Sequence, residues 1–285
     1  MISQSETPLE EAALQEWVGR SKSVDDTLRA AQSNLMEATL SRETMLRDGD
    51  PLPALWHWIY FLEGSPTAKL GRDGHAAKGE FLPAVPLPRR MWAGGRLTYQ
   101  RHPTLGEKMR RTSTIHKTAL KKGSSGTLCF VTVLHEHFDA NDALCFSEEQ
   151  DIVYREDPAP NVPAPKPVPQ PDGSAYEETV SPSSVLLFRY SALTFNSHRI
   201  HYDRAYCTDV EGYPGIIFHG PLTATLLADL AVRRNPDKML KRFSFRATSP
   251  LFDTEDFTIH SDDQGTVWAA TPAGGLAMKA TAEFE

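Results

Sequence analysis

The pattern of apolar and polar positions predicts a chain made mainly of strands, with a small number of helices. Near the start, Ser23 precedes two acidic residues, and apolar residues from Leu28 to Ala38 recur at helical spacing. We therefore expect an amphipathic helix that begins just after Ser23. From Gly95 onward, runs rich in Thr, Val, Ile, Phe and Tyr alternate with turn residues and predict four strands, at residues 96–101, 108–121, 127–137 and 143–154.

A proline-rich segment, residues 157–172, divides the chain into two parts. Seven of its sixteen residues are proline, which fixes φ and removes a backbone donor, so neither a helix nor a central strand can form there. We interpret the segment as a semi-rigid linker. It would join an N-terminal module, residues 1–156, to a C-terminal module, residues 173–285.

The C-terminal module shows the same combination of helix and strand patterns over a shorter length. A helix is expected to start at Ser181-Pro182, and a second, apolar helix spans residues 222–232. Leucines form one stripe of this second helix and alanines cover most of the rest, so it should be nearly enclosed. Four strand-like runs close the chain, at residues 239–247, 256–261, 266–271 and 276–284. A buried helix followed by a β-meander predicts an α+β fold, with a sheet wrapped around the helix.

Charge and composition exclude several classes of protein. The 285 residues carry 30 Lys and Arg against 37 Asp and Glu, and a net charge of −7 argues against binding to duplex nucleic acid. No run approaches the roughly 18 apolar residues of a membrane helix, and the acidic, polar start of the chain lacks a secretory signal pattern. The three scattered cysteines form no CxxC pair, which suits buried thiols in a reducing cytosol.

Side chains that could take part in catalysis gather in the loop before the apolar helix. His201 could act as a general base, because the ordinary pKa of histidine lies near neutral pH, although a loop histidine is often only hydrogen-bonded. Asn196 offers an amide that can hold a water or a carbonyl without titrating. Gly220 opens the helix, and its N–H together with that of Leu222 could stabilise an oxyanion. The histidines of this region lack a zinc-binding spacing such as HExxH, so we expect no metal.

Taken together, these residues resemble the motif of the (R)-specific enoyl-thioester hydratases, the MaoC-like or hydratase 2 family, which has the hot-dog fold. In that motif Asn196 falls on the catalytic aspartate and His201 on the catalytic histidine. His198 falls on the asparagine and Arg199 on the proline of the motif, and Ile200 takes its aliphatic place. The rest is matched by Ala205, Gly212-Tyr213 and the helix start Ile217-Phe218-His219-Gly220. Because an amide cannot carry a proton, Asn196 could position water or substrate but could not be the acid–base partner of His201.

The variant SALTFNSHRIHYD and the upstream Met91–Gly95 look like a narrower, double-hot-dog branch. This branch contains mitochondrial 3-hydroxyacyl-thioester dehydratases and bacterial mesaconyl-C4-CoA hydratases. The resemblance covers the chain from about Trp17 to Phe284. It implies a tandem (double) hot-dog fold in which each antiparallel sheet wraps around a long helix. Catalysis would belong to the second module, and the first would be degenerate.

The resemblance implies reversible hydration of a trans-2-enoyl thioester, with mesaconyl-C4-CoA as the favoured substrate and dehydration of medium-chain 3-hydroxyacyl thioesters as the alternative. His201 would activate water, the N–H groups of Gly220 and Leu222 would hold the thioester oxygen, and Asp203 or His198 could support the imidazole. No metal, flavin or nicotinamide is needed, because coenzyme A is part of the substrate. A hot-dog acyl-CoA thioesterase and a non-catalytic acyl-CoA-binding module remain open.

A basic stretch adds a separate indication. Residues 89–122 contain ten Lys and Arg and one acid, Glu107, which could attract the phosphates of coenzyme A or could simply form a solvated strand face. The candidate substrate-binding arginines are Arg89, Arg90, Arg110, Arg111 and Arg199. We expect a bacterial cytoplasmic protein, with the mitochondrial matrix as the second choice, and neither a membrane nor a nucleic-acid partner. A homodimer is compatible with this picture.

Overall fold

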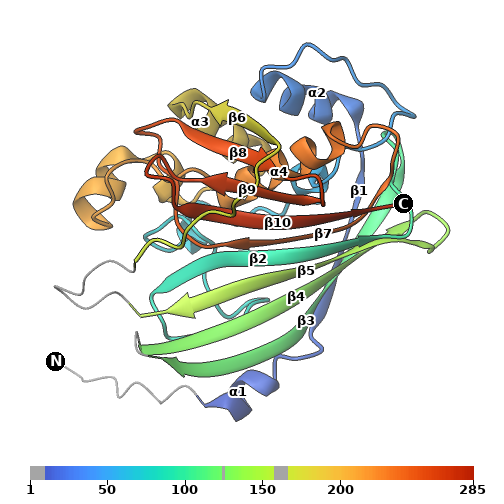
Figure 1. Ribbon diagram of the computed structural model, residues 1–285. Coiled ribbons are helices and arrows are strands. Elements are labelled where there is room, and N and C mark those ends of the chain that lie inside the picture. Colours follow the sequence, from blue (N-terminus) through green and yellow to red (C-terminus); the bar gives the residue numbers. More distant parts are fainter. Residues whose placement is uncertain (1–9, 124–125, 157–165) are drawn as a thin grey trace, which may run out of the picture.

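The computed structural model describes residues 10–123, 126–156 and 166–285 of the chain. Its centre is a ten-stranded antiparallel sheet with the order β1-β3-β4-β5-β2-β7-β10-β9-β8-β6 (Figure 1). The strands are β1 (Ser21–Thr27), β2 (Arg89–Tyr99), β3 (Lys108–Gly123), β4 (Gly126–Asp139), β5 (Leu144–Arg155), β6 (Tyr176–Val180), β7 (Leu240–Ala247), β8 (Phe257–Ser261), β9 (Thr266–Ala270) and β10 (Leu276–Phe284). The α+β prediction is confirmed.

The helices are few, and most are short. The α-helices are α1 (Glu11–Gln15), α2 (Ala30–Thr39), α3 (Ser184–Leu193) and α4 (Gly220–Arg233). Shorter helical turns are η1 (Trp56–Ile59), η2 (Thr67–Lys69), η3 (Arg199–His201) and η4 (Tyr206–Val210). In the part of the chain that the structure describes, none of them is long and apolar enough to cross a membrane.

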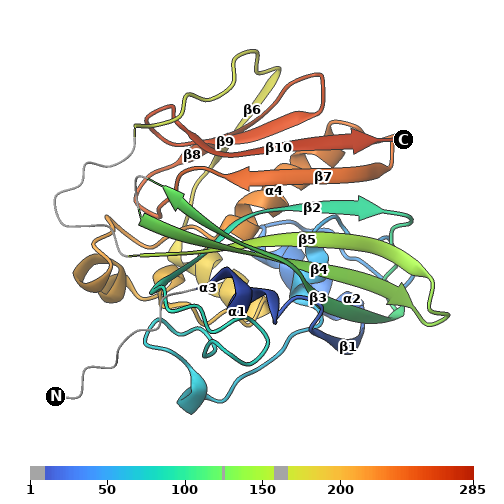
Figure 2. The same ribbon diagram turned by 90° about the horizontal axis from the view of Figure 1, so that it is seen from below.

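The two halves of the sheet join where β2 pairs with β7 (Figure 2). Glycine is required at this joint, because a Cβ on Gly94 would lie 2.4 Å from the carbonyl oxygen of Phe245 and one on Gly95 would lie 2.7 Å from the Phe245 ring. The strands of the N-terminal part and those of the C-terminal part therefore form one continuous surface. Side chains from both parts can consequently meet on the same face.

Helix α4 packs against β7, β8, β9 and β10. Leu222, Leu227 and Leu230 are fully buried, and Ala224 and Ala228 are as well. This confirms the prediction of a nearly enclosed apolar helix. The helix begins at Gly220, the residue predicted to open it and two positions before the predicted apolar span. Pro221 fits the first helical turn, where its missing N–H costs nothing.

The predicted start of the first helix is wrong. Ser23 lies in β1, where it pairs with Thr112 of β3, and the helix begins only at Ala30. Residues 21–27 are mostly polar, and their backbone hydrogen bonds are satisfied by a strand that lies almost ninety positions later in the chain. The pattern of a single segment cannot reveal such a partner. Helix α3 likewise begins slightly later than expected, at Ser184, with the Ser183 side chain capping the N–H of Leu186.

The proline-rich segment is only partly described. Residues 157–165 of the predicted linker lie outside the described residues. After them, Val168 accepts a hydrogen bond from the N–H of Leu276, and Pro169 forms an isolated bridge with Gly275. The end of this segment is therefore attached to the start of β10. The division at residues 157–172 stays a prediction.

Candidate active site

His201 lies at the end of η3 and is 7% exposed. Its Nδ1 is 2.9 Å from the carbonyl oxygen of Ile217. Because a carbonyl can only accept, Nδ1 carries the hydrogen and Nε2 keeps a lone pair. Burial lowers the pKa of His201 to about 4, against the opposing effect of the Ile217 hydrogen bond. His201 is therefore a neutral imidazole at neutral pH, with Nε2 available as a base.

A second histidine fixes the plane of this ring. His219, the residue before α4, is fully buried and stacks on His201 with the ring centroids 3.8 Å apart and the planes 17° from parallel. Its Nε2 shares a 2.8 Å hydrogen bond with the hydroxyl of Ser191 in α3. Burial, and then the neighbouring histidines, lower the pKa of His219 well below its usual range. His219 thus holds the His201 ring between the end of α3 and the start of α4.

Asn196 shapes the loop that carries His201. Its backbone N–H donates to the carbonyl of Ser191 at 2.8 Å, and its Oδ1 accepts the N–H of His198 at 3.0 Å. The residue before it, Phe195, has a positive φ of 50°, which turns the chain sharply at the end of α3. With Oδ1 occupied by the backbone, the Nδ2 group is the part of Asn196 that could donate to a ligand.

The start of α4 lies under an aromatic side chain of the N-terminal part. A Cβ on Gly220 would be 3.1 Å from the ring of Trp92 in β2, so glycine allows this close approach. Trp92 also contacts Phe245 at 4.6 Å and Trp58 at 5.5 Å between ring centroids. The predicted oxyanion donors, Gly220 and Leu222, therefore occupy a helix start covered by aromatic rings. Low polarity around such donors strengthens their interaction with a developing negative charge.

Two further residues, which the sequence reasoning missed, reach the same region from the loop after η2. Asp73 and His75 are paired, with Oδ2 and Nδ1 2.9 Å apart. The His75 ring lies against His198, 3.9 Å between centroids, and His198 is perpendicular to His201 at 5.4 Å. No recognisable motif surrounds Asp73 and His75, and they are more than 120 positions from His201. Only the folded arrangement connects them.

The same group offers ligand atoms that a divalent cation could use. One atom each from Asp73, His75 and His198 lie within 4.8 Å of one another. Both oxygens of Asp73 already accept hydrogen bonds from His75, at its Nδ1 and at its backbone N–H. These hydrogen bonds account for the contact between Asp73 and His75 without a cation.

The expected support of His201 by Asp203 is not found. Asp203 accepts hydrogen bonds from the Arg199 guanidinium at 2.7 and 3.0 Å and from the N–H of Tyr206 at 3.0 Å. The Nδ1 of His201, which Asp203 was expected to orient, is taken by Ile217. The short helical turn η3 places the Asp203 carboxylate beside Arg199, four positions earlier. The guanidinium of Arg199, which was predicted to bind substrate, is therefore paired with Asp203.

Most of the other candidate arginines are occupied by acidic side chains. Arg89 lies 3.3 Å from Glu211, Arg110 2.7 Å from Asp142 and Arg111 2.8 Å from Glu63. These acids lie outside the basic stretch in the sequence. In the folded protein, these acidic side chains therefore neutralise part of the positive charge of residues 89–122.

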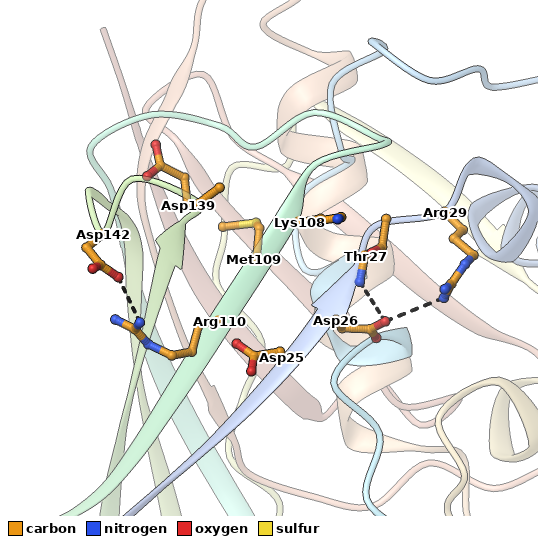
Figure 3. Close-up of a pocket in the computed structure, with 10 residues that line it drawn as sticks. Asp25, Asp26, Thr27, Arg29, Lys108, Met109, Arg110, Asp139 and Asp142 are labelled. Atoms are coloured by element: carbon orange, nitrogen blue, oxygen red, sulfur yellow. Dashed lines mark hydrogen bonds and ion pairs between the residues drawn. The ribbon is translucent and has the colours of Figure 1, made fainter.

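Arg110 belongs to a different surface from the histidines. It lines an open pocket of about 450 Å³ together with acidic and basic residues of β1, β3 and the turn between β4 and β5 (Figure 3). None of the histidines near His201 lines this pocket. Arg90 differs, because its charge helps to lower the pKa of both His75 and His198, after the larger effect of burial. Arg90 thus lies near the histidines, as does Arg199, which stands between His198 and His201 in the chain.

Comparison with solved structures identifies the fold. A Mycobacterium tuberculosis protein described as having a double hot-dog fold matches with a TM-score of 0.56 and 14% identity, covering 94% of this chain and 96% of that one. At this identity the similarity concerns the fold alone. The expected tandem hot-dog arrangement is confirmed.

Comparison of sequences identifies the family. The profile of the family hydroxyacyl-thioester dehydratase type 2 matches residues 55–253. Mesaconyl-C(4)-CoA hydratase of Chloroflexus aurantiacus is 45% identical over 273 residues, covering 94% of this chain and 96% of that protein. The mitochondrial hydroxyacyl-thioester dehydratase type 2 of Schizosaccharomyces pombe is 28% identical, covering 85% of this chain and 90% of that protein. The chain therefore belongs to the hydroxyacyl-thioester dehydratase type 2 family.

Proposed function

We propose that this protein is a hydro-lyase that reversibly hydrates an enoyl-CoA thioester, and that mesaconyl-C4-CoA is its substrate, giving citramalyl-CoA. The assignment of substrate rests on the 45% identity to a mesaconyl-C(4)-CoA hydratase over nearly the full length of both proteins. The observation that carries the chemistry is the hydrogen bond from His201 to Ile217, which leaves Nε2 of a neutral, buried imidazole as a base.

In the proposed reaction, His201 takes a proton from water as the water oxygen bonds to C3 of the thioester. Negative charge then develops on the thioester oxygen, where the N–H groups of Gly220 and Leu222 would stabilise it. Asn196 would hold the water or the substrate through Nδ2. This scheme uses only groups of the chain and the substrate, and it assigns no role to a metal, a flavin or a nicotinamide. We further propose a cytoplasmic location.

Dehydration of straight-chain 3-hydroxyacyl thioesters is the second candidate, favoured by the match to the family profile. A panel of enoyl-CoAs with and without a second carboxylate, analysed by mass spectrometry, separates the two. Addition of water with coenzyme A retained supports a hydratase, and preference within the panel decides the substrate. Release of free coenzyme A thiol would instead indicate a thioesterase, and binding without turnover a binding module.

The role of His201 can be tested on the preferred substrate. His201→Ala should lower kcat by about two to four orders of magnitude, the usual effect of losing a general acid–base group. His116→Ala, an exposed histidine of β3, is the matched control and should keep wild-type turnover. Thermal unfolding of both variants shows whether they are folded. A folded His201→Ala with normal kcat would remove His201 from the mechanism.

A further inference from the structure

We propose that Asp73 and His75 form the second proton-handling pair of this site, in which His75 exchanges the proton at C2 of the acyl group and Asp73 positions His75. The inference rests on the proposed hydratase function. Hydration requires a proton at C2 as well as a base for the water, and because Asn196 cannot carry a proton, His201 would otherwise make both transfers. The pair also gives the N-terminal module a direct part in the reaction.

The pair has a defined proton arrangement. The Asp73 carboxylate accepts from Nδ1 of His75 at 2.9 Å and from the His75 backbone N–H at 3.0 Å. A carboxylate only accepts, so the hydrogen lies on Nδ1 and Nε2 keeps the lone pair. Burial alone would raise the pKa of Asp73, but its hydrogen bonds with His75 hold it well below its usual range. Asp73 is therefore ionised, and it orients His75 as Ile217 orients His201.

The loop that carries this pair is docked onto the His201 loop at close range. The N–H of Arg199 donates to the carbonyl of Asp73 at 2.8 Å, and the Ser197 hydroxyl donates to the carbonyl of Gly74. Gly74 has a φ of +87°, and a Cβ there would lie 2.0 Å from the carbonyl oxygen of Ser197. Contact this close, with backbone on both sides, fixes the position of His75 relative to residues 197–201.

The rings form a row from His75 through His198 to His201, with centroid distances of 3.9 and 5.4 Å. The charged and titratable groups that act on His75 are Asp73, His198, His201, Arg90 and Lys78. Burial, with Arg90 and Lys78, lowers the pKa of His75, and Asp73 only partly opposes this. Burial also lowers the pKa of His198, and His75 and His201 add to the effect. The row is thus neutral at neutral pH and can take up one proton from the substrate.

In the dehydration direction, Nε2 of His75 takes the C2 proton, and the electron pair of that C–H bond moves into the thioester to form an enolate. His75 then gives this proton to solvent, to which its side chain is 26% exposed, and Nε2 of His201 takes up a proton from solvent. The C3–O bond then breaks, the enolate electrons form the double bond, and the hydroxyl leaves as water with the proton from His201. Hydration is the reverse, and the enzyme is unchanged in both directions.

A metal site built from the same residues is the competing interpretation. Two observations disfavour it: Asp73 and His75 already bond to each other, and the positive charges of Arg90 and Lys78 act on this cluster. Metal dependence is therefore treated as an outcome of the experiment.

The experiment measures two partial reactions of the 3-hydroxyacyl-CoA product in D₂O: deuterium entry at C2 and loss of water. The His75 side chain is 26% exposed, so a proton on it can exchange with solvent. His201→Gln should keep deuterium entry and lose dehydration by about 10²-fold or more, whereas His75→Gln should lose both by a similar factor. Asp73→Asn should slow deuterium entry and shift the acidic limb of its pH profile downward, because removing the carboxylate lowers the pKa of His75.

Asp203→Asn is the matched control, since Asp203 lies near His201 in sequence but is bound to Arg199. It should leave deuterium entry and its pH profile unchanged. Wild-type deuterium entry in His75→Gln, or its loss only in His201→Gln, would overturn the proposal. So would loss of wild-type activity on chelation and its return with Zn²⁺. If His75→Gln does not fold, Asp73→Asn decides alone. A wild-type protein that turns over no thioester would instead refute the proposed function.

Discussion

Gly74→Ala should lower kcat in a protein that stays folded, because it pushes apart two loops that must stay in contact. The new Cβ would lie 2.0 Å from the carbonyl oxygen of Ser197, whereas ordinary contacts begin at 3.4 Å. The opposing atom is backbone, so it cannot rotate away as a flexible side chain could. The loop of residues 71–77, or the one that carries His201, must therefore move by about 1 Å or more.

Two effects set the magnitude. A non-glycine residue at the φ of +87° costs roughly 1–2 kcal/mol of stability. A displacement of about 1 Å in a catalytic arrangement can lower the rate by roughly 10²-fold. We therefore expect kcat to fall by about two orders of magnitude in a protein that remains folded.

Gly173→Ala provides the matched control. Gly173 has nearly the same φ, +81°, but nothing lies within 4 Å of the Cβ that alanine would add. It should therefore show the backbone cost without the displacement. The assay follows loss of enoyl absorbance at saturating substrate, with thermal unfolding of both variants alongside. Equal kcat values for the two alanine variants would show that docking of the Asp73 loop does not control the reaction.

Two other predictions concern charge. Arg90→Gln should raise KM by about tenfold (roughly 1.4 kcal/mol), because Arg90 lies near His75 and His198, whereas Arg110→Gln should leave KM unchanged, because Arg110 pairs with Asp142 on another surface. Steady-state kinetics on both variants checks this, and equal effects would contradict it. The free energy of unfolding should be highest above about pH 6.5 and should fall as the pH drops toward 4. Burial lowers the pKa of His135 and His201 to about 4 in the folded protein. The unfolded chain therefore binds more protons in this range, and lowering the pH favours unfolding. Urea unfolding at pH 7.5, 5.5 and 4.5 measures it, and a constant free energy of unfolding would refute it.

Local sequence patterns predicted those helices and strands whose burial follows from their own residues. The apolar stripe of α4 requires enclosure wherever the helix lies, and seven of the eight predicted strand runs became strands close to the expected bounds. The exception is β2, which begins at Arg89, seven residues before its expected start. The segment around Ser23 shows the limit. Its polar residues fit a helix start as well as an edge strand, and pairing with β3 decided between them.

The sequence alone predicted the family, which the comparisons confirm, and it proposed Asn196 and His201 as site residues, because both belong to one short motif that can be read along the chain. It could not determine which groups surround His201. Asp203, two positions away, turned to Arg199, and acids from distant segments neutralised Arg110 and Arg111. Asp73 and His75, more than 120 positions away, docked beside His198. Contacts of this kind depend on how the two modules close on each other, and only the tertiary structure sets that geometry.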